Sequence, residues 1–280
     1  MPDLDELAEA FRLSPVDGAV NLAGFDPAQT PLVDGKKEAK KELKDDLAEE
    51  LFDEHELLFA TEDRSLLLVL QGIDCSGKNG TIKHVVIHMN PAGVRTASFT
   101  EPTDEEKSEH FLDRHRRELP KPGQLGVFDR SYYEDYLVPA VHRKLDDDEL
   151  ANRLEEINAF EKELIDDGTI LIKCMLHISY DEQRERFLRR LRRDDKRWKF
   201  LPSDLESRGK WDEFQAAYGQ VLTATSTEHA PWYVIPADHK WYRNWAIAHL
   251  ILETLRTLNL TYPQPEFNLA DLRSQLEPPG

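Results

Sequence analysis

Ten residues set the fold of this chain: Gly72-Ile-Asp-Cys-Ser-Gly77-Lys78-Asn79-Gly80-Thr81, which follow an apolar run over 66–71 and open a helical pattern. A buried strand, a glycine-rich turn and a helix leave successive backbone N–H groups facing one concavity, which suits phosphate oxygens. The spacing G-x-x-x-x-G-K matches the phosphate-binding loop, or P-loop. The alternative is an ordinary glycine-rich turn. We predict that the loop binds phosphate through Lys78 and through Gly72, Gly77, Asn79, Gly80 and Thr81.

Two positions in this loop are unusual. The residue after Lys78 is Asn79, where the motif normally has a Ser or Thr whose hydroxyl binds Mg²⁺. We therefore expect Thr81 or a carboxylate to help hold the metal. Asp74 places a carboxylate beside the expected phosphates, which is costly unless it binds a metal or orients a nucleophile. The alternative for Asp74 is a turn-forming residue that bonds its own backbone.

Apolar runs alternate with helical patterns along the chain. We predict strands at 66–71, 95–99, 124–128, 169–177 and 232–235. The patterns between and around them predict helices at 36–60, 81–89, 103–119, 146–166, 181–193, 202–227 and 241–258. This order predicts an α/β fold, a doubly wound parallel sheet of about five strands flanked by helices. We expect an N-terminal extension over 1–35, a P-loop kinase-like domain over 36–262 and a C-terminal tail over 263–280, with both ends wrapping the surface or fraying.

A second acidic position follows another predicted strand. Asp129 and Arg130 come directly after the run 124–128, and ligands of such sheets bind beyond the carboxyl ends of the strands. We expect Asp74 and Asp129 to hold Mg²⁺, with Mn²⁺ as an alternative, and Arg130 to bind phosphate through its planar donors. The alternative for Asp129 is a helix cap or a structural partner of Arg130.

Charge is unevenly distributed. The net charge of −18 argues against a general nucleic-acid binder. Basic residues nevertheless crowd one segment: Arg184, Arg186, Arg189, Arg190, Arg192, Arg193, Lys196, Arg197 and Lys199. We predict a helical, arginine-rich lid over about 181–212 that closes on phosphates, with Arg186, Arg189, Arg190, Lys196 and Arg197 as ligands. The alternative is a solvated helix face paired with nearby acids.

Length and composition limit the class of protein to which this chain can belong. A chain of 280 residues suits one α/β domain with flanking helices. Its two cysteines, Cys75 and Cys174, are expected to be free thiols of a reducing compartment. The sequence has no secretory signal pattern and no apolar stretch of transmembrane length. We expect a cytoplasmic protein that has no membrane partner.

Several motifs together resemble the polyphosphate kinase type 2 family. They are the P-loop, Asn90-Pro91, Phe128-Asp-Arg-Ser-Tyr-Tyr133, Lys196-Arg-Trp-Lys-Phe200 and Ala230-Pro-Trp-Tyr-Val234, in order between about 36 and 260. The resemblance implies a core similar to thymidylate kinase with a helical lid. It also implies Mg²⁺-dependent, reversible transfer of the terminal phosphoryl group between inorganic polyphosphate and a nucleotide (AMP, ADP or ATP). By matching position, Asp74 and Asp129 would be the essential carboxylates, Lys78 the P-loop lysine and Arg130 a phosphate ligand.

The same resemblance suggests an acceptor. The stretch 132–135 and the run 226–230 are most similar to the subgroup that phosphorylates both AMP and ADP, which places Tyr133 and Glu134 near the acceptor nucleotide. Arg143 is expected to replace an arginine that many relatives carry in the turn 138–140. The helix predicted at 36–60 carries an apolar stripe, and members of the family often self-associate. Both points suggest a homo-oligomer, either a dimer or a tetramer.

Two other functions are compatible with a P-loop. An ATP-dependent nucleotide kinase of the thymidylate kinase type needs the same loop and lid, but the basic excess between Arg184 and Lys199 exceeds what one triphosphate requires. A non-catalytic P-loop regulator would be expected to carry the guanine-specific motif N-K-x-D, which the sequence lacks. Polyphosphate-dependent nucleotide phosphorylation is therefore the leading hypothesis.

Overall fold

The computed structural model describes residues 2–14 and 18–276, and it contains one sheet. The strands lie in the order β1-β6-β5-β2-β4-β3. Five of them are parallel: β2 (Ser65–Gln71), β3 (Val94–Ser98), β4 (Leu125–Asp129), β5 (Thr169–His177) and β6 (Trp232–Pro236). The predicted doubly wound parallel sheet is confirmed, with one antiparallel edge strand, β1 (Arg12–Leu13), that the sequence did not reveal.

Strand β2 is buried on both of its faces, which explains why its sequence reads as a continuous apolar run. Leu66, Leu68 and Leu70 belong to one apolar cluster, whereas Leu67 and Val69 belong to a second. Side chains alternate across a strand, so each face of the sheet receives its own core. The sheet therefore needs a layer of helices on both sides.

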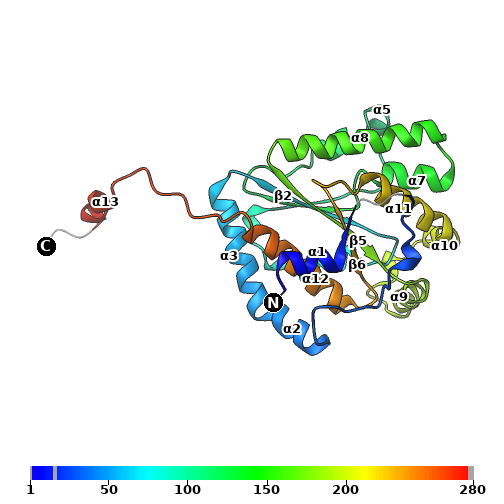
Figure 1. Cartoon of the computed structure of the whole chain (residues 1–280), viewed down its shortest axis with the longest axis horizontal. Helices are drawn as coiled ribbons and strands as arrows, with labels where there is room; N and C mark the ends of the chain where they lie inside the picture. Colours follow the sequence, from blue (N-terminus) through cyan, green and yellow to red (C-terminus); the bar gives the residue numbers. More distant parts are fainter. Residues whose placement is uncertain (1, 15–17, 277–280) are drawn as a thin grey trace.

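Two groups of helices supply these layers (Figure 1). On one side, α12 (Lys240–Arg256) contacts α1 (Leu4–Phe11), α2 (Lys36–Lys44), α3 (Asp46–Thr61) and α4 (Lys78–His84). On the other, α7 (Glu134–His142), α8 (Asp147–Asp166) and α11 (Trp211–Thr225) contact one another. Trp245 and Ile251 anchor the first cluster, and Phe160 and Leu222 anchor the second.

Three predicted helices are interrupted. The predicted helix at 36–60 divides at Asp45, which ends α2 and precedes α3. The one at 103–119 becomes α5 (Asp104–Ser108) and α6 (Asp113–Arg116), and the one at 202–227 becomes α10 (Ser203–Gly209) and α11. The capping box from Thr103 to Glu106 is present as predicted. In the first of these helices, Leu43, Leu47 and Leu51 keep helical spacing across the break, so periodicity alone could not locate it.

The remaining elements are short. Helix α9 (Tyr180–Arg192) follows β5 and leads into the 3₁₀ turn η4 (Arg197–Lys199). Helix α4 is shorter than predicted and is followed by the 3₁₀ turn η2 (Val86–His88), while η1 (Leu22–Gly24) and η3 (Pro91–Gly93) lie in connections. Helix α7 was not predicted, because it contains Pro139 and proline normally interrupts a helix.

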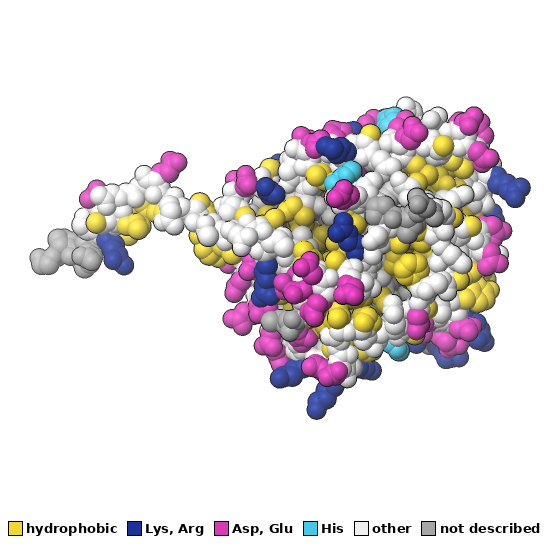
Figure 2. Space-filling view, viewed as in Figure 1, with side chains coloured by type: hydrophobic (Ala, Val, Ile, Leu, Met, Phe, Trp, Pro, Cys, Tyr) yellow, Lys and Arg dark blue, Asp and Glu magenta, His cyan; other side chains and the backbone are white. Residues whose placement is uncertain are grey.

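The two ends of the chain behave differently. The N-terminal segment packs on the domain, since Leu7 and Phe11 of α1 are buried and β1 pairs with β6. The C-terminal helix α13 (Leu269–Leu276) extends away from the body in Figure 1 and has no buried residue. No helix in the described ranges has the length and apolar character needed to cross a membrane. On the face drawn in Figure 2, acidic side chains are spread among basic and hydrophobic ones.

The strand register aligns three loops at one edge. Leu70, next to the end of β2, pairs with Asp129 at the end of β4, and Asp129 pairs with Ser98 at the end of β3. The segments that follow these residues therefore leave the sheet side by side. This edge is where the P-loop and Asp129 meet.

Candidate active site

The P-loop joins the end of β2 to the start of α4 in the predicted order. Gly72 and Gly77 have φ values of +146° and +117°, a backbone region that other residues rarely adopt. Gly77 and Gly80 also make room for Arg243 of α12: a Cβ would lie 1.7 Å from Arg243 Nη1 at Gly77 and 2.7 Å from Nη2 at Gly80. These two glycines are therefore required by an arginine from the far end of the sequence as well as by the turn.

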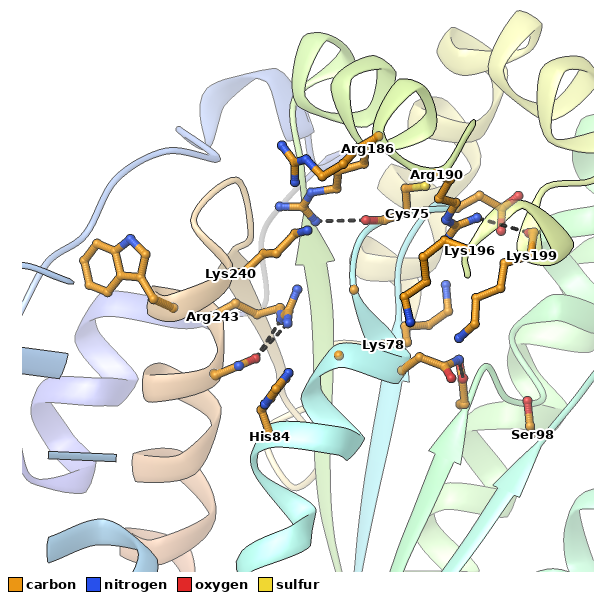
Figure 3. A pocket seen from close by; sticks show the side chains of 18 of the residues that line it. Cys75, Lys78, His84, Ser98, Arg186, Arg190, Lys196, Lys199, Lys240 and Arg243 are labelled. Atoms are coloured by element: carbon orange, nitrogen blue, oxygen red, sulfur yellow. Dashed lines mark hydrogen bonds between the residues drawn. The ribbon is translucent and has the colours of Figure 1, made fainter. Parts of the chain in front are cut away.

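A cavity of about 890 Å³ opens beside this loop (Figure 3). One part of its wall is formed by loop residues 74, 75 and 77–80, by the end of β3 together with residues 99–100, and by Asp129 and Arg130. Among the described residues, twelve Lys and Arg side chains but only two carboxylates, Asp74 and Asp129, line it. The basic side chains are Lys40, Lys44, Lys78, Arg130, Arg186, Arg189, Arg190, Arg193, Lys196, Lys199, Lys240 and Arg243.

The predicted catalytic residues meet in this cavity. Arg130 Nη2 donates to Asp74 Oδ1 at 2.9 Å, and Asn79 Nδ2 donates to Asp129 Oδ2 at 2.5 Å. Lys78 Nζ donates to the Gly72 carbonyl at 2.6 Å. Arg130 has a φ of +64°, and the negative charges of Glu134 and Asp74 raise its pKa above the ordinary value. The two carboxylates, the lysine and Arg130 therefore line the same cavity, each held by a hydrogen bond to a neighbouring group.

Arg186 does not have the role predicted for it. Its side chain is buried, and all five N–H donors are used within the protein. Nε donates to Glu182 at 2.7 Å, and Nη1 donates to the carbonyls of Cys75 and Ser76 at 2.8 and 2.9 Å. Nη2 donates to the carbonyls of Ala237 and Asp238. Arg186 thus ties α9 and the P-loop to the β6–α12 connection, and it has no donor left for phosphate.

The rest of the basic segment divides into two parts. The cavity is lined by Arg189, Arg190 and Lys196, three of the residues predicted to contact phosphate. It is also lined by Arg193 and Lys199, which were not among the predicted ligands. Lys196 and Lys199 point toward Lys78 in Figure 3. Arg197 lies outside the cavity, because its Nε donates to the Leu191 carbonyl at 2.7 Å and its Nη1 pairs with the exposed Asp194. The prediction that Arg197 faces the phosphates is wrong for this conformation.

Two further P-loop positions face the protein interior. Thr81 is fully buried and does not line the cavity, and among the described residues its hydroxyl has no hydrogen-bond partner. It is therefore not placed to hold a metal in the cavity. Gly72 contributes its carbonyl to Lys78 and also lies behind the cavity wall.

The predicted acceptor residues are separated by the fold. Glu134 is half-buried next to Arg130, and desolvation raises its pKa against the opposing charges of Arg130 and Lys78. Tyr133 is fully buried, and its hydroxyl donates to Glu161 in the core at 2.6 Å. Arg143 is exposed at the end of α7 and does not line the cavity. Glu134 does not line the cavity either, but it neighbours Arg130, which does, so it is the best placed of the three to contact the acceptor.

Sequence reasoning missed the opposite wall of the cavity. Lys40 and Lys44 of α2, and Lys240 and Arg243 of α12, line it although no recognised motif contains them. The spacing of Lys40 and Lys44 puts both on one helix face, which was the available signal. Burial and the charges of Arg186 and Arg189 lower the pKa of Lys240 to about 8. Burial and the charge of Arg186 likewise lower the pKa of Arg243 to about 9.

We predict that Arg186→Lys destabilises the protein and weakens phosphate binding. A lysine has three donors and cannot span the four carbonyls, so buried acceptors lose their partners at a cost of about 1–3 kcal/mol of unfolding free energy. Urea denaturation and calorimetric titration with tripolyphosphate measure the two effects. Arg184→Lys, on the exposed part of the same helix, is the matched control. Equal behaviour of the two variants would contradict the assigned role.

The pKa of Lys240 predicts a pH effect on anion binding. The side chain carries its charge below about pH 8 and loses it above that value. We expect the affinity for tripolyphosphate to fall between pH 7 and pH 9 in the wild type, and Lys240→Gln to reduce both the affinity at pH 7 and the fall. Lys121→Gln, in the turn before β4 at the opposite edge of the sheet, is the control. An unchanged pH profile in Lys240→Gln would refute the prediction.

Comparison with known proteins adds an independent line of evidence. The sequence profile described as polyphosphate kinase 2 matches residues 34–262. An AMP/ADP-polyphosphate phosphotransferase of Meiothermus ruber is 45% identical over 256 residues, which cover 91% of this chain and 96% of the relative. An ADP-polyphosphate phosphotransferase of Rhodopseudomonas palustris is 39% identical over 226 residues, covering 76% and 78%.

A solved structure agrees with the sequence comparison. The crystal structure of polyphosphate kinase 2 from Arthrobacter aurescens superposes on this chain with a TM-score of 0.93 at 41% identity, covering 99% of this chain and 98% of that one. The resemblance drawn from the motifs is thereby confirmed over most of the chain, together with the P-loop fold. This chain belongs to the polyphosphate kinase 2 family.

Proposed function

We propose that this protein transfers the terminal phosphoryl group of inorganic polyphosphate to AMP and to ADP. The observation that carries the proposal is the cavity beside the P-loop, where twelve basic side chains and two carboxylates meet. One nucleoside triphosphate would leave many of these cations without an anionic partner, whereas a long phosphate chain would contact in series those other than Arg186, whose donors are all used within the protein. Family membership and the activities for which the relatives are named support the same reaction.

The reaction needs positioning and charge neutralisation more than covalent help from the protein. An acceptor phosphate oxygen attacks the terminal phosphorus of the polymer. A new P–O bond forms to the nucleotide, the terminal anhydride P–O bond breaks, and a polyphosphate shortened by one unit leaves. Lys78 and Arg130, which line the cavity, would neutralise charge on the transferred group, and the lid cations would exclude water and add to that field.

The residues present fit a divalent cation. Mg²⁺ prefers oxygen ligands and is commonly held by one or two carboxylates together with substrate phosphates. Asp74 and Asp129 supply two carboxylates at the cavity wall. We propose that they would hold Mg²⁺, or Mn²⁺ in its place. The bound ion would supply positive charge that reduces the negative charge of the phosphate oxygens.

The contacts of α9 suggest how a lid over 181–212 would move. The first turns of α9 are fixed to the P-loop, because Gln183 Nε2 donates to the Asp74 carbonyl at 3.0 Å and Arg186 binds the next two carbonyls. Beyond them much of the segment is exposed, and Trp198 is 74% exposed, although Phe187 and Asp204 are buried. We propose that the part after Arg186 closes on the polymer while the base of the helix stays in place.

Three broader expectations also stay proposals. A cytoplasmic location is supported by Cys75 and Cys174, which are both free thiols. Self-association into a dimer or tetramer is supported by the exposed apolar side chains Tyr262, Phe267, Leu269, Leu272 and Leu276 near the C-terminus. The high negative net charge supports the expectation that nucleic acid is not the partner.

We predict that AMP with long-chain polyphosphate and Mg²⁺, without ATP, yields first ADP and then ATP. ADP under the same conditions should yield ATP directly. Lys78→Ala should lower kcat/KM by about 10²–10³-fold, because it removes a charge from the transferred group. Lys83→Ala, an exposed residue of the same helix outside the cavity, is the control.

Nucleotide chromatography measures the products. Product that forms only when ATP is the donor would favour the thymidylate kinase-type alternative. Turnover of ADP but not of AMP would support polyphosphate as the donor but would overturn the proposal that both nucleotides are acceptors. Near wild-type rates in Lys78→Ala would refute the assignment of that lysine.

A further inference from the structure

A group of four polar side chains lies in the core behind the candidate active site. Tyr132 and Tyr133 follow β4, Glu161 belongs to α8 and Lys173 lies in the middle of β5. All four are at most 1% exposed. None of them lines the cavity, and the transfer reaction described above makes no use of them. We refer to these four residues as the buried network.

Every donor of the network has an acceptor. Lys173 Nζ donates to Glu161 Oε2 at 2.6 Å, to the Thr225 carbonyl at 2.7 Å and to the Tyr133 hydroxyl at 3.1 Å. These three bonds use the full donor capacity of the ammonium group. The Thr225 carbonyl belongs to the last turn of α11, where carbonyls lack helical partners. The lysine therefore joins β5, α8 and α11.

Both tyrosines are bound by the same carboxylate oxygen. The hydroxyls of Tyr132 and Tyr133 donate to Glu161 Oε1 at 2.8 and 2.6 Å. Their rings are also confined, because Tyr132 packs against Phe160 and Tyr133 packs against Trp232. Two consecutive residues of one turn are thus held at both the ring and the hydroxyl.

Stability alone is a weak explanation for this arrangement. Removing two charges from water is costly, and apolar side chains of similar volume often stabilise a core as well as a buried ion pair does. An ion pair with fully satisfied hydrogen bonds also fixes the positions of the groups that take part, because hydrogen bonds are directional. In this protein the groups that are held in position belong to the turn that carries the tyrosines.

That turn also carries active-site groups. Arg130 and Glu134 flank the segment 131–133, and Arg130 has a positive φ of 64°, which is unfavourable for a residue other than glycine. The Ser131 carbonyl accepts from the Glu134 backbone N–H at 2.9 Å, so the turn leads directly into α7. Fixing Tyr132 and Tyr133 on the core side therefore limits where Arg130, which lines the cavity, and its neighbour Glu134 can lie.

We propose that Glu161 and Lys173 are positioning residues for phosphoryl transfer, acting through Tyr132 and Tyr133 on Arg130 and Glu134. The inference rests on the proposed function, since it assigns these residues to the transfer reaction. Neither Glu161 nor Lys173 touches a substrate. They fix the turn between β4 and α7 in the conformation that places Arg130 beside Asp74 and Glu134 beside Arg130.

The first test removes the two hydroxyls and keeps the ion pair. Tyr132→Phe/Tyr133→Phe should lower kcat/KM for the nucleotide by about 10-fold or more, up to about 100-fold, because small displacements of reacting groups are costly in rate. The KM for polyphosphate should stay unchanged, since most of the basic lining comes from other elements. Tyr136→Phe is the matched control, because its hydroxyl bonds Gln220 outside the network at 2.9 Å.

The second test separates positioning from stability. The variant Tyr132→Phe/Tyr133→Phe/Glu161→Leu/Lys173→Met replaces the whole network by apolar groups, and its unfolding midpoint should be close to that of the wild type. We expect its turnover to stay as low as that of the double variant. A fourfold variant that has both the stability and the turnover of the wild type would overturn the proposal.

The outcomes are distinguishable from a failure of the proposed function. Wild-type protein that does not use polyphosphate as donor would refute the proposed function, and the positioning role with it. Active wild type with a fully active double variant would refute the positioning role alone. If the fourfold variant does not fold, the comparison of the double variant with Tyr136→Phe still decides the question.

Discussion

The hydrogen bonds of Arg186 hold the candidate active site together. One buried guanidinium joins α9, the P-loop and the β6–α12 connection by bonding five acceptors. In a trans peptide the C=O and N–H groups point in opposite directions, so holding the Cys75 and Ser76 carbonyls on the outside favours N–H groups on the cavity side. The same bonds fix the base of the lid and bring α12, with Lys240 and Arg243, to the loop. The phosphate-binding geometry is therefore prepared before any ligand arrives.

This arrangement explains how a chain with a net charge of −18 can receive a polyanion. Five separate elements contribute basic side chains to one cavity, and charges on the rest of the surface act only over about 8 Å at physiological salt. Within the cavity, burial together with the neighbouring charges of Arg186 and Arg189 lowers the pKa of Lys240 to about 8. A ligand with regularly spaced negative charges relieves that repulsion along its whole length.

The sequence predicted the parts of the site that lie in continuous segments. The P-loop, the parallel strands and the meeting of Asp74, Lys78, Asp129 and Arg130 follow from strand ends, which share one edge of a parallel sheet. The basic wall from α2 and α12 could not be foreseen, because helix packing alone brings it to the loop.

The sequence also did not predict the direction in which individual side chains point. Tyr133 is adjacent to Glu134 in sequence, yet its side chain enters the core. Arg186 and Arg190 are four residues apart on one helix and both reach the cavity wall, but only Arg186 meets the loop carbonyls that use all its donors. Composition and spacing do not distinguish an arginine that binds ligand from one that shapes the site.

The most direct test of a cavity built for a phosphate polymer is a comparison of donors. Initial rates of ATP formation from ADP would be measured with tripolyphosphate and with long-chain polyphosphate at low and high ionic strength. If the cavity binds the polymer along its length, kcat/KM should be higher for the long chain, and this advantage should fall more steeply with salt because more ion pairs are screened. Equal kcat/KM values with equal salt dependence would show that only the few residues around the P-loop contact the donor, which is incompatible with binding along the cavity.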